Sequence, residues 1–246
     1  MKIRLTIYPI LIKIWIMKDE KGKFVPEVFS ELRQKTVPVP ETIYQASGIM
    51  VLNRRIKSLL FSTDIAVIKN SNANSIMAVY PFTPQLSITQ AIIEVAPVPV
   101  FVGVGGGITT GNRSIHIALQ AELLGAYGVV VNVPMSVSVI EQMAKEIDIP
   151  IISTVVSEYD EVVEKIKAGV KILNVSGGIN TPEIVKKLRS RLGKEFPIIA
   201  TGGPTDETVL KTVEAGANAI TYTPPTSADI FEKIMIEYRN NKNKLS

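Results

Sequence analysis

From about residue 55 onward, the chain repeats one pattern of hydrophobic and polar positions. A short run of aliphatic and β-branched residues comes first, and Gly, Pro, Ser or Thr follows it. The runs are apolar throughout and do not alternate, which is typical of parallel strands covered on both faces. Eight such runs occur, at residues 58–62, 75–80, 98–104, 128–133, 149–155, 170–175, 197–201 and 217–223.

The segments between these runs have the spacing of helices, with apolar residues three and four apart and charges between them. They include residues 63–72, 118–124, 137–147, 159–168, 182–192, 207–215 and 228–238, and the first of them is short. Eight strand–helix units in a row predict an α/β fold, a single (β/α)8 TIM barrel over residues 55–246. In such a barrel the functional site is expected where the strands end.

The first 54 residues do not follow this pattern. Residues 2–7 alternate like a strand, residues 19–23 have the composition of a turn, and the prolines of residues 37–40 favour an extended chain. We therefore predict an N-terminal extension over residues 1–54, with a short hairpin and a linker. Lys13 interrupts the initial apolar run, and no small-residue cleavage site follows. These features predict a cytoplasmic protein without a membrane anchor.

The amino-acid composition excludes several kinds of catalytic and metal site. The chain has no cysteine, which excludes disulfides, thiolate metal sites and cysteine nucleophiles. Its one histidine, His116, falls in the helix of the third unit, just before the periodic stretch at residues 118–124, where a structural or surface role is expected. The net charge of +4 comes from scattered Lys and Arg residues, so nucleic acid is not an expected partner.

Two parts of the chain read alike. Residues 99–109 with 124–134 correspond to residues 197–206 with 215–225, half a barrel apart, which suggests a duplicated half-barrel. Glycines that follow a strand let backbone N–H groups approach an anion, and the next helix start adds partial positive charge. The alternative is that these glycines only make tight turns, and that Arg113 is a solvated surface residue. The predicted phosphate-binding residues are Gly105, Gly106, Gly107, Arg113, Gly177, Gly178, Gly202, Gly203 and Thr223.

Residues 200–203 (ATGG) followed by residues 215–220 (AGANAI) resemble the ribulose-phosphate-binding TIM barrels. The two-fold repeat is similar to the histidine-biosynthesis barrels, and this resemblance implies one phosphate in each half. It covers about residues 98–226. Those barrels use an aspartate near the end of strand one and another near strand five. Asp64 could stand in for the first, but residues 153–156 (STVV) contain no acid.

Asp64 is the one strong base at a predicted strand end. It is a candidate for acid/base catalysis, and the alternative is that it caps the helix that begins beside it. Asn132 and Asn174 each interrupt an aliphatic run, and a buried amide needs a polar partner, which is backbone, water or ligand. We predict Asp64, Asn132 and Asn174 as catalytic residues. The predicted pocket is completed by Tyr80, Thr154, Ser176, Thr201 and Thr221.

The leading hypothesis is an isomerase or lyase that acts on a small phosphorylated metabolite. A hydrolase on the same barrel and a non-catalytic ligand-binding or structural barrel are the alternatives. No predicted strand ends in lysine, which disfavours a Schiff-base aldolase. No carboxylate cluster reaches the strand ends, so no metal is predicted. No cofactor is predicted either, although flavin mononucleotide is an alternative ligand. The apolar helices are compatible with a homodimer.

Overall fold

The computed structural model describes residues 17–18, 24–26, 28, 37–158 and 160–242. The chain divides into two compact units, Met1–Lys35 and Thr36–Ser246. In the first unit, the two-residue strands β1 (Met17–Lys18) and β2 (Phe24–Val25) pair antiparallel. The predicted strand alternation at residues 2–7 lies outside the described residues.

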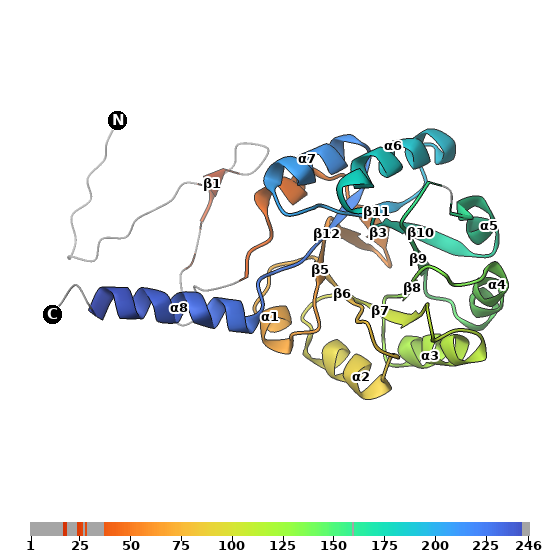
Figure 1. The fold of residues 1–246 in the computed structure, drawn as a ribbon, viewed down its shortest axis with the longest axis horizontal. Coiled ribbons are helices and arrows are strands. Elements are labelled where there is room, and N and C mark those ends of the chain that lie inside the picture. The colour runs from red at the N-terminus through yellow and green to blue at the C-terminus, as the bar shows by residue number, and fades with distance from the viewer. Residues whose placement is uncertain (1–16, 19–23, 27, 29–36, 159, 243–246) are drawn as a thin grey trace. The chain divides into compact units, whose positions relative to one another are not determined.

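In the described part of the second unit, eight parallel strands close a barrel in chain order (Figure 1). They are β5 (Ser58–Phe61), β6 (Ser75–Ala78), β7 (Val100–Gly105), β8 (Gly128–Val131), β9 (Ile151–Val155), β10 (Val170–Val175), β11 (Ile198–Thr201) and β12 (Ala219–Tyr222). The ring closes where β12 pairs with β5. Each strand overlaps one of the eight apolar runs, so the predicted barrel is confirmed.

Helices follow the strands and pack around them, as Figure 1 shows for α1 to α7. The helices are α1 (Ile65–Lys69), α2 (Leu86–Val95), α3 (Asn112–Leu123), α4 (Val137–Glu146), α5 (Val162–Lys167), α6 (Thr181–Leu192), α7 (Asp206–Glu214) and α8 (Ser227–Lys242). Apolar residues at helical spacing, such as the fully buried Ile140 and Met143 of α4, face the strands. Among the described helices, none has the length and apolar character needed to span a membrane.

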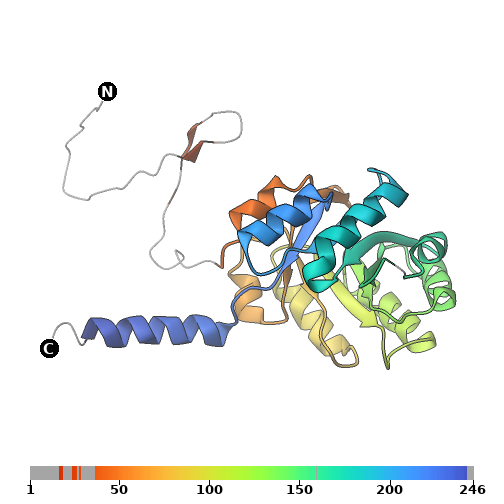
Figure 2. The same cartoon turned by 45° about the horizontal axis from the view of Figure 1, so that its top comes forward.

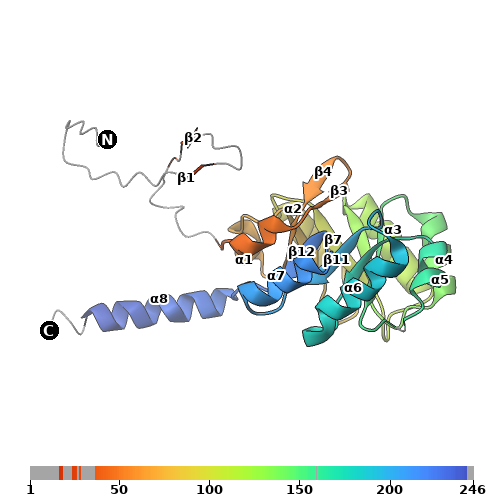
Figure 3. The ribbon, with the colours of Figure 1, turned by 90° about the horizontal axis from the view of Figure 1, so that it is seen from above.

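The inside of the barrel is filled by one apolar side chain from each strand. These are Leu59, Met77, Phe101, Val130, Ile152, Ile172, Ile199 and Ala219. A hairpin of β3 (Ile49–Val51) and β4 (Arg54–Ile56) adds Ile49, Val51 and Ile56 to this cluster. Figure 3 shows the hairpin at one end of the barrel. Because it packs against the start of the strands, the site has to lie at their other end.

Residues 37–46 also belong to the barrel unit. Val37, Val39 and Ile43 are buried in the outer core, between strands and helices. The 3-10 helix η2 (Glu41–Gln45) packs alongside α7, as the orange and blue segments of Figure 2 show. The predicted boundary at residues 54/55 therefore lies inside the compact unit. Three-residue strands and a single 3-10 turn are too short to produce a periodic pattern, so the sequence did not reveal them.

Candidate functional site

Within the described residues, three adjoining cavities of about 700, 530 and 320 Å³ lie at the carboxyl ends of the barrel strands. Val79, which directly follows β6, and Asn132, which directly follows β8, line all three. We call the largest of them the central cavity. The predicted pocket residues Thr154, Ser176, Thr201 and Thr221 line it together with Asn132 and Asn174. Tyr80 lines the other two cavities.

Asn132, Thr154 and Asn174 form a row across three neighbouring strands. Asn174 on β10 stands opposite Thr154 on β9, and Val131 on β8 stands opposite Ser153, which puts Asn132 at the level of Thr154. The Thr154 hydroxyl donates to Asn132 Oδ1 at 3.0 Å. Asn174 Nδ2 donates to Thr154 Oγ1 at 3.4 Å. Parallel register therefore converts three separate strand-end positions into one hydrogen-bonded chain.

At one end of this hydrogen-bonded row, an amide oxygen is left unpaired. Asn174 is 6% exposed, and its buried Oδ1 has no hydrogen-bond partner among the described residues. At the other end, Asn132 is half-buried, and its Nδ2 finds no acceptor among the described residues. An unpaired buried amide oxygen costs about 1–3 kcal/mol. The two amides that the sequence singled out thus end at the cavity with unused hydrogen-bonding capacity.

Asp64 caps α1. Its Oδ1 accepts from the amides of Ala66 and Val67 at 3.0 and 3.1 Å, and its Oδ2 accepts from the amide of Ser227 at 3.0 Å. Partial burial acts to raise the pKa of the carboxyl, but the hydrogen bonds from Ser227, Val67 and Ala66 outweigh it and hold the pKa below its usual range. The capping alternative is therefore what the geometry shows, and a carboxylate held in this way is a weak base.

The loop from β7 to α3 borders the smallest cavity, and it contains the first glycine cluster. Gly105, Gly106 and Gly107 line that cavity with Thr109 and Asn132. Gly106 has φ +126°, and a Cβ there would lie 2.7 Å from Asn132 Cβ, so the loop needs glycine to approach Asn132. The amide of Gly107 finds no acceptor among the described residues.

The start of α3 is free of the features that usually satisfy a helix end. Its N-cap, Gly111, supplies no side-chain hydrogen bond, and the first turn holds no acidic residue. Arg113 lies in this first turn and is exposed. Backbone N–H groups at such a start carry partial positive charge. Gly107 lines the cavity, and the chain runs on from it to the start of α3, but Arg113 is not among the residues that line any of the three cavities.

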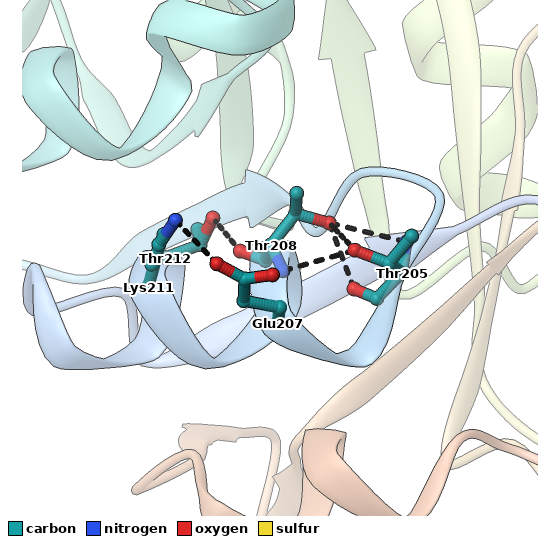
Figure 4. A network of polar contacts seen from close by, with 5 residues as sticks. All are labelled: Thr205, Glu207, Thr208, Lys211 and Thr212. Atoms are coloured by element: carbon teal, nitrogen blue, oxygen red, sulfur yellow. Dashed lines mark hydrogen bonds and ion pairs between the residues drawn. The ribbon is translucent and has the colours of Figure 1, made fainter.

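The second glycine cluster precedes a helix start that is already satisfied. Gly202 donates its amide to Thr221 O at 3.1 Å. In the described α7, Thr205 and Thr208 form a reciprocal capping box, and Asp206 and Glu207 occupy the first turn (Figure 4). These carboxylates oppose a bound anion. The loop after β12 continues from Thr223 into two prolines, which have no N–H to donate.

The glycines after β10 have a structural role in the turn that leads to α6. The amide of Gly177 donates to Thr181 Oγ1 at 3.0 Å, and a Cβ at Gly177 would lie 2.3 Å from Ile184 Cδ1. Gly178 begins the 3-10 turn η3 (Gly178–Asn180) with φ +60°. The structure brings neither Gly177 nor Gly178 into the three cavities.

Several lining residues were missed, Val79 and Thr109 among them. Val79 and Thr109 border the site, and Thr109 Oγ1 donates to Thr83 Oγ1 at 3.1 Å, which ties the loop after β7 to the loop after β6. Val79 falls inside an apolar run, and Thr109 lies four residues beyond β7. Neither position could therefore be recognised from the sequence as part of a site.

The donor set does not fit a metal ion. Among the described residues, no three His, Cys, Asp or Glu side chains lie close enough to hold one. Of the described residues that line the three cavities, Asp64 alone carries a carboxylate, and both of its oxygens already accept hydrogen bonds. The expectation that no metal binds stays a prediction.

No protein-family model and no curated protein sequence matches this chain. Solved structures do resemble it. A phosphonopyruvate hydrolase complexed with oxalate and Mg²⁺ is 12% identical, with a TM-score of 0.58, over 76% of this chain and 83% of that one. A phosphoenolpyruvate phosphomutase from Streptomyces platensis subsp. rosaceus is 14% identical, with a TM-score of 0.56, over 76% and 82% of the two chains. The aldolase QR15 is 16% identical, with a TM-score of 0.55, over 73% and 95%.

The chain folds as a TIM barrel. At these identities the likeness shows the fold alone, and it does not single out the ribulose-phosphate-binding superfamily. Activity has to be argued from the residues of this barrel.

Proposed function

We propose that this TIM barrel is an enzyme of the isomerase or lyase type, and that it binds a small phosphorylated metabolite at the carboxyl ends of its strands. The observation that carries the proposal is the segment from Gly105 to Arg113, in which the free amide of Gly107 borders the cavity that Asn132 also lines and the uncapped start of α3 follows in the chain. The names of two structural neighbours, phosphonopyruvate hydrolase and phosphoenolpyruvate phosphomutase, support phosphorus-containing substrates on this fold.

We place the phosphate at the start of α3. The start of α7 is less suitable, because its first turn is satisfied by Thr205 and carries Asp206 and Glu207. At α3 the dipole acts without an opposing carboxylate, and Arg113 adds a charge-assisted contact. The repeat in the sequence would then have kept its phosphate function in one half of the barrel. Gly202, Gly203 and Thr223 remain candidates for a second, weaker anion contact.

The proposed chemistry uses neutral groups. Asn132 Nδ2 is free to donate to an oxygen that gains negative charge in the transition state, and preorganised donors of this kind stabilise such a charge. Asn174 would orient the same reacting group. Asp64 is proposed only as a weak acid/base candidate, because its carboxylate is engaged by three backbone amides.

One observation favours a second function. Since Asp64 is the only carboxylate among the described cavity-lining residues and is engaged by three amides, a barrel that binds a phosphorylated ligand without turnover fits the same geometry. No feature of the described residues favours the hydrolase alternative. A cytoplasmic location and a homodimer stay predictions.

Phosphate binding is the first test. We expect inorganic phosphate to raise the melting temperature, since a ligand at about 100 times its Kd adds about 2.7 kcal/mol to stability. Arg113→Gln should weaken binding by about tenfold or more, the effect of one lost charge-assisted hydrogen bond. Lys211→Gln is the matched control, because Lys211 pairs with Glu207 on α7. No stabilisation by phosphate, or an equal loss in both variants, contradicts the proposal.

Flavin mononucleotide belongs in the same titration, because its phosphate would use the same loop. Turnover of a panel of sugar phosphates then separates an enzyme from a binding protein. Binding without turnover of any member would favour the second function.

A further inference from the structure

The row Asn132–Thr154–Asn174 restricts what can bind in the central cavity. This inference rests on the proposed function, because it concerns the part of the metabolite that is not phosphate. The three side chains lie on adjacent strands and are joined by hydrogen bonds of 3.0 and 3.4 Å. They line the cavity, which has a volume of about 700 Å³.

The Thr154 hydroxyl has one proton, so it can donate to only one of its two neighbours. The hydrogen bonds of the row therefore run in one direction. Thr154 donates to Asn132 and accepts from Asn174, which leaves the Asn132 Nδ2 group, the second hydrogen of Asn174 Nδ2 and the Asn174 Oδ1 acceptor unused. If the hydroxyl turned and both amides flipped, Asn132 would offer an acceptor and Asn174 a donor. In either direction, the row keeps one amide oxygen unused at one end and unused amide hydrogens beside it.

We infer that the central cavity recognises a neutral group that both donates and accepts hydrogen bonds, such as a hydroxyl beside a carbonyl or a second hydroxyl. A carboxylate only accepts, so it can take hydrogens from the amide nitrogens but leaves the unused amide oxygen unpaired beside its negative charge. A site that leaves a buried polar group unpaired rejects that ligand strongly. The substrate class is therefore a phosphorylated hydroxy compound rather than a phosphorylated carboxylic acid.

The burial of Asn174 supports a binding role. Asn174 is 6% exposed, and its Oδ1 has no partner among the described residues although Thr154 stands beside it on the neighbouring strand. Asn218 is a matched comparison. Its Oδ1 accepts from Arg189 and from the amide of Ile198, and its Nδ2 donates to Ser47. A buried amide that stabilises the fold forms its hydrogen bonds with other residues of the protein, as Asn218 does.

The binding test uses two probes of similar length, glycerol 3-phosphate and phosphoglycolate. We expect the full-length protein to bind glycerol 3-phosphate about tenfold more tightly than phosphoglycolate, as measured by calorimetry. Asn174→Leu should abolish this preference and leave the affinity for inorganic phosphate unchanged. Equal or tighter binding of phosphoglycolate overturns the inference. If inorganic phosphate binds in that case, the proposed function still stands.

The second arm needs no ligand. Asn174→Leu should keep or raise the melting temperature of the free protein, because it removes an unpaired amide. Asn218→Leu should lower it by about 4 °C or more, because it removes several hydrogen bonds from a domain of this size. If Asn174→Leu lowers the melting temperature as Asn218→Leu does, Asn174 serves the fold and the inference fails. If phosphate does not bind, this arm still decides the role of Asn174, and the failure belongs to the proposed function.

Discussion

Arg189 of α6 donates from Nη2 to Asn218 Oδ1 at 2.8 Å, just before β12. The same guanidinium also donates to the backbone oxygens of Gly193, Phe196 and Gly216. All four acceptors are neutral, and burial lowers the pKa of Arg189. The arginine therefore holds the end of α6 to the start of β12 through its hydrogen bonds, and it forms no ion pair with the residues that the structure describes.

Arg189→Met should lower the free energy of unfolding by about 2–4 kcal/mol, because it leaves several carbonyl groups without donors. Urea unfolding measures this change. Arg191→Met is the control on the same helix, since Arg191 is exposed and makes one long contact of 3.3 Å with Glu158 O. It should stay within about 0.5 kcal/mol of the wild type. Equal losses in the two variants would show that the network adds nothing.

The hairpin of β3 and β4, which packs against one end of the barrel, is expected to be essential for stability. Ile56 is 2% exposed and packs inside the barrel, so Ile56→Ala should cost about 2–5 kcal/mol. Met50, in the same hairpin, is 64% exposed, and Met50→Ala should change stability little. Thermal and urea unfolding of both variants provide the comparison, and a cost at Ile56 no larger than at Met50 would contradict the packing role.

Truncation tests where the barrel unit begins. Removal of residues 1–35 should leave a cooperatively folded protein, because Thr36–Ser246 forms its own compact unit. Removal of residues 1–54 should abolish cooperative unfolding, because it exposes the partners of Val39, Ile43 and Ile49. Circular dichroism melts measure both. A cooperative melt of the shorter chain would show that the boundary at 54/55 is the correct one.

Gly106→Ala should disturb the site as well as the fold. The added Cβ would meet Asn132 at 2.7 Å, and φ is +126°, so we expect a cost of about 2–4 kcal/mol and weaker phosphate binding. Gly107→Ala separates the two causes. Its φ is +65° but nothing lies within 4 Å of the added Cβ, so only about 1 kcal/mol of backbone strain is expected. Unfolding and calorimetry on the pair decide whether contact with Asn132 matters.

The cap at Asp64 should make stability depend on pH. Asp64→Ala should cost about 1–2 kcal/mol at pH 7. Because the folded pKa is lowered, this contribution is present above the unfolded value of about 3.9 and is lost as the pH falls through the lower folded value. The gap between wild type and variant, followed by urea unfolding, should therefore narrow below about pH 4. The exposed Asp148→Ala provides the control. A gap that stays constant down to pH 2 would contradict the linkage.

Much of the candidate site could be predicted because strand ends converge in a barrel. Asn132 and Asn174 stood out since each polar amide follows or interrupts an aliphatic run, and both line the central cavity. Gly202 and Gly203 read like Gly105 to Gly107 in the sequence. Their surroundings differ, because Thr205, Asp206 and Glu207 occupy the start of α7. The number of glycines in a loop does not show whether the backbone N–H groups at the following helix start already have hydrogen-bond partners.

By itself, the sequence determined the eight strands and their barrel, because apolar runs of this length can be buried on both faces only in a parallel sheet covered by helices. Only the tertiary structure decided that residues 37–56 complete that barrel, and that Asn132, Thr154 and Asn174 touch one another. These contacts join residues that are 20 or more positions apart in the chain. They depend on strand register, which is set by the closed ring of strands and not by the residues on either side.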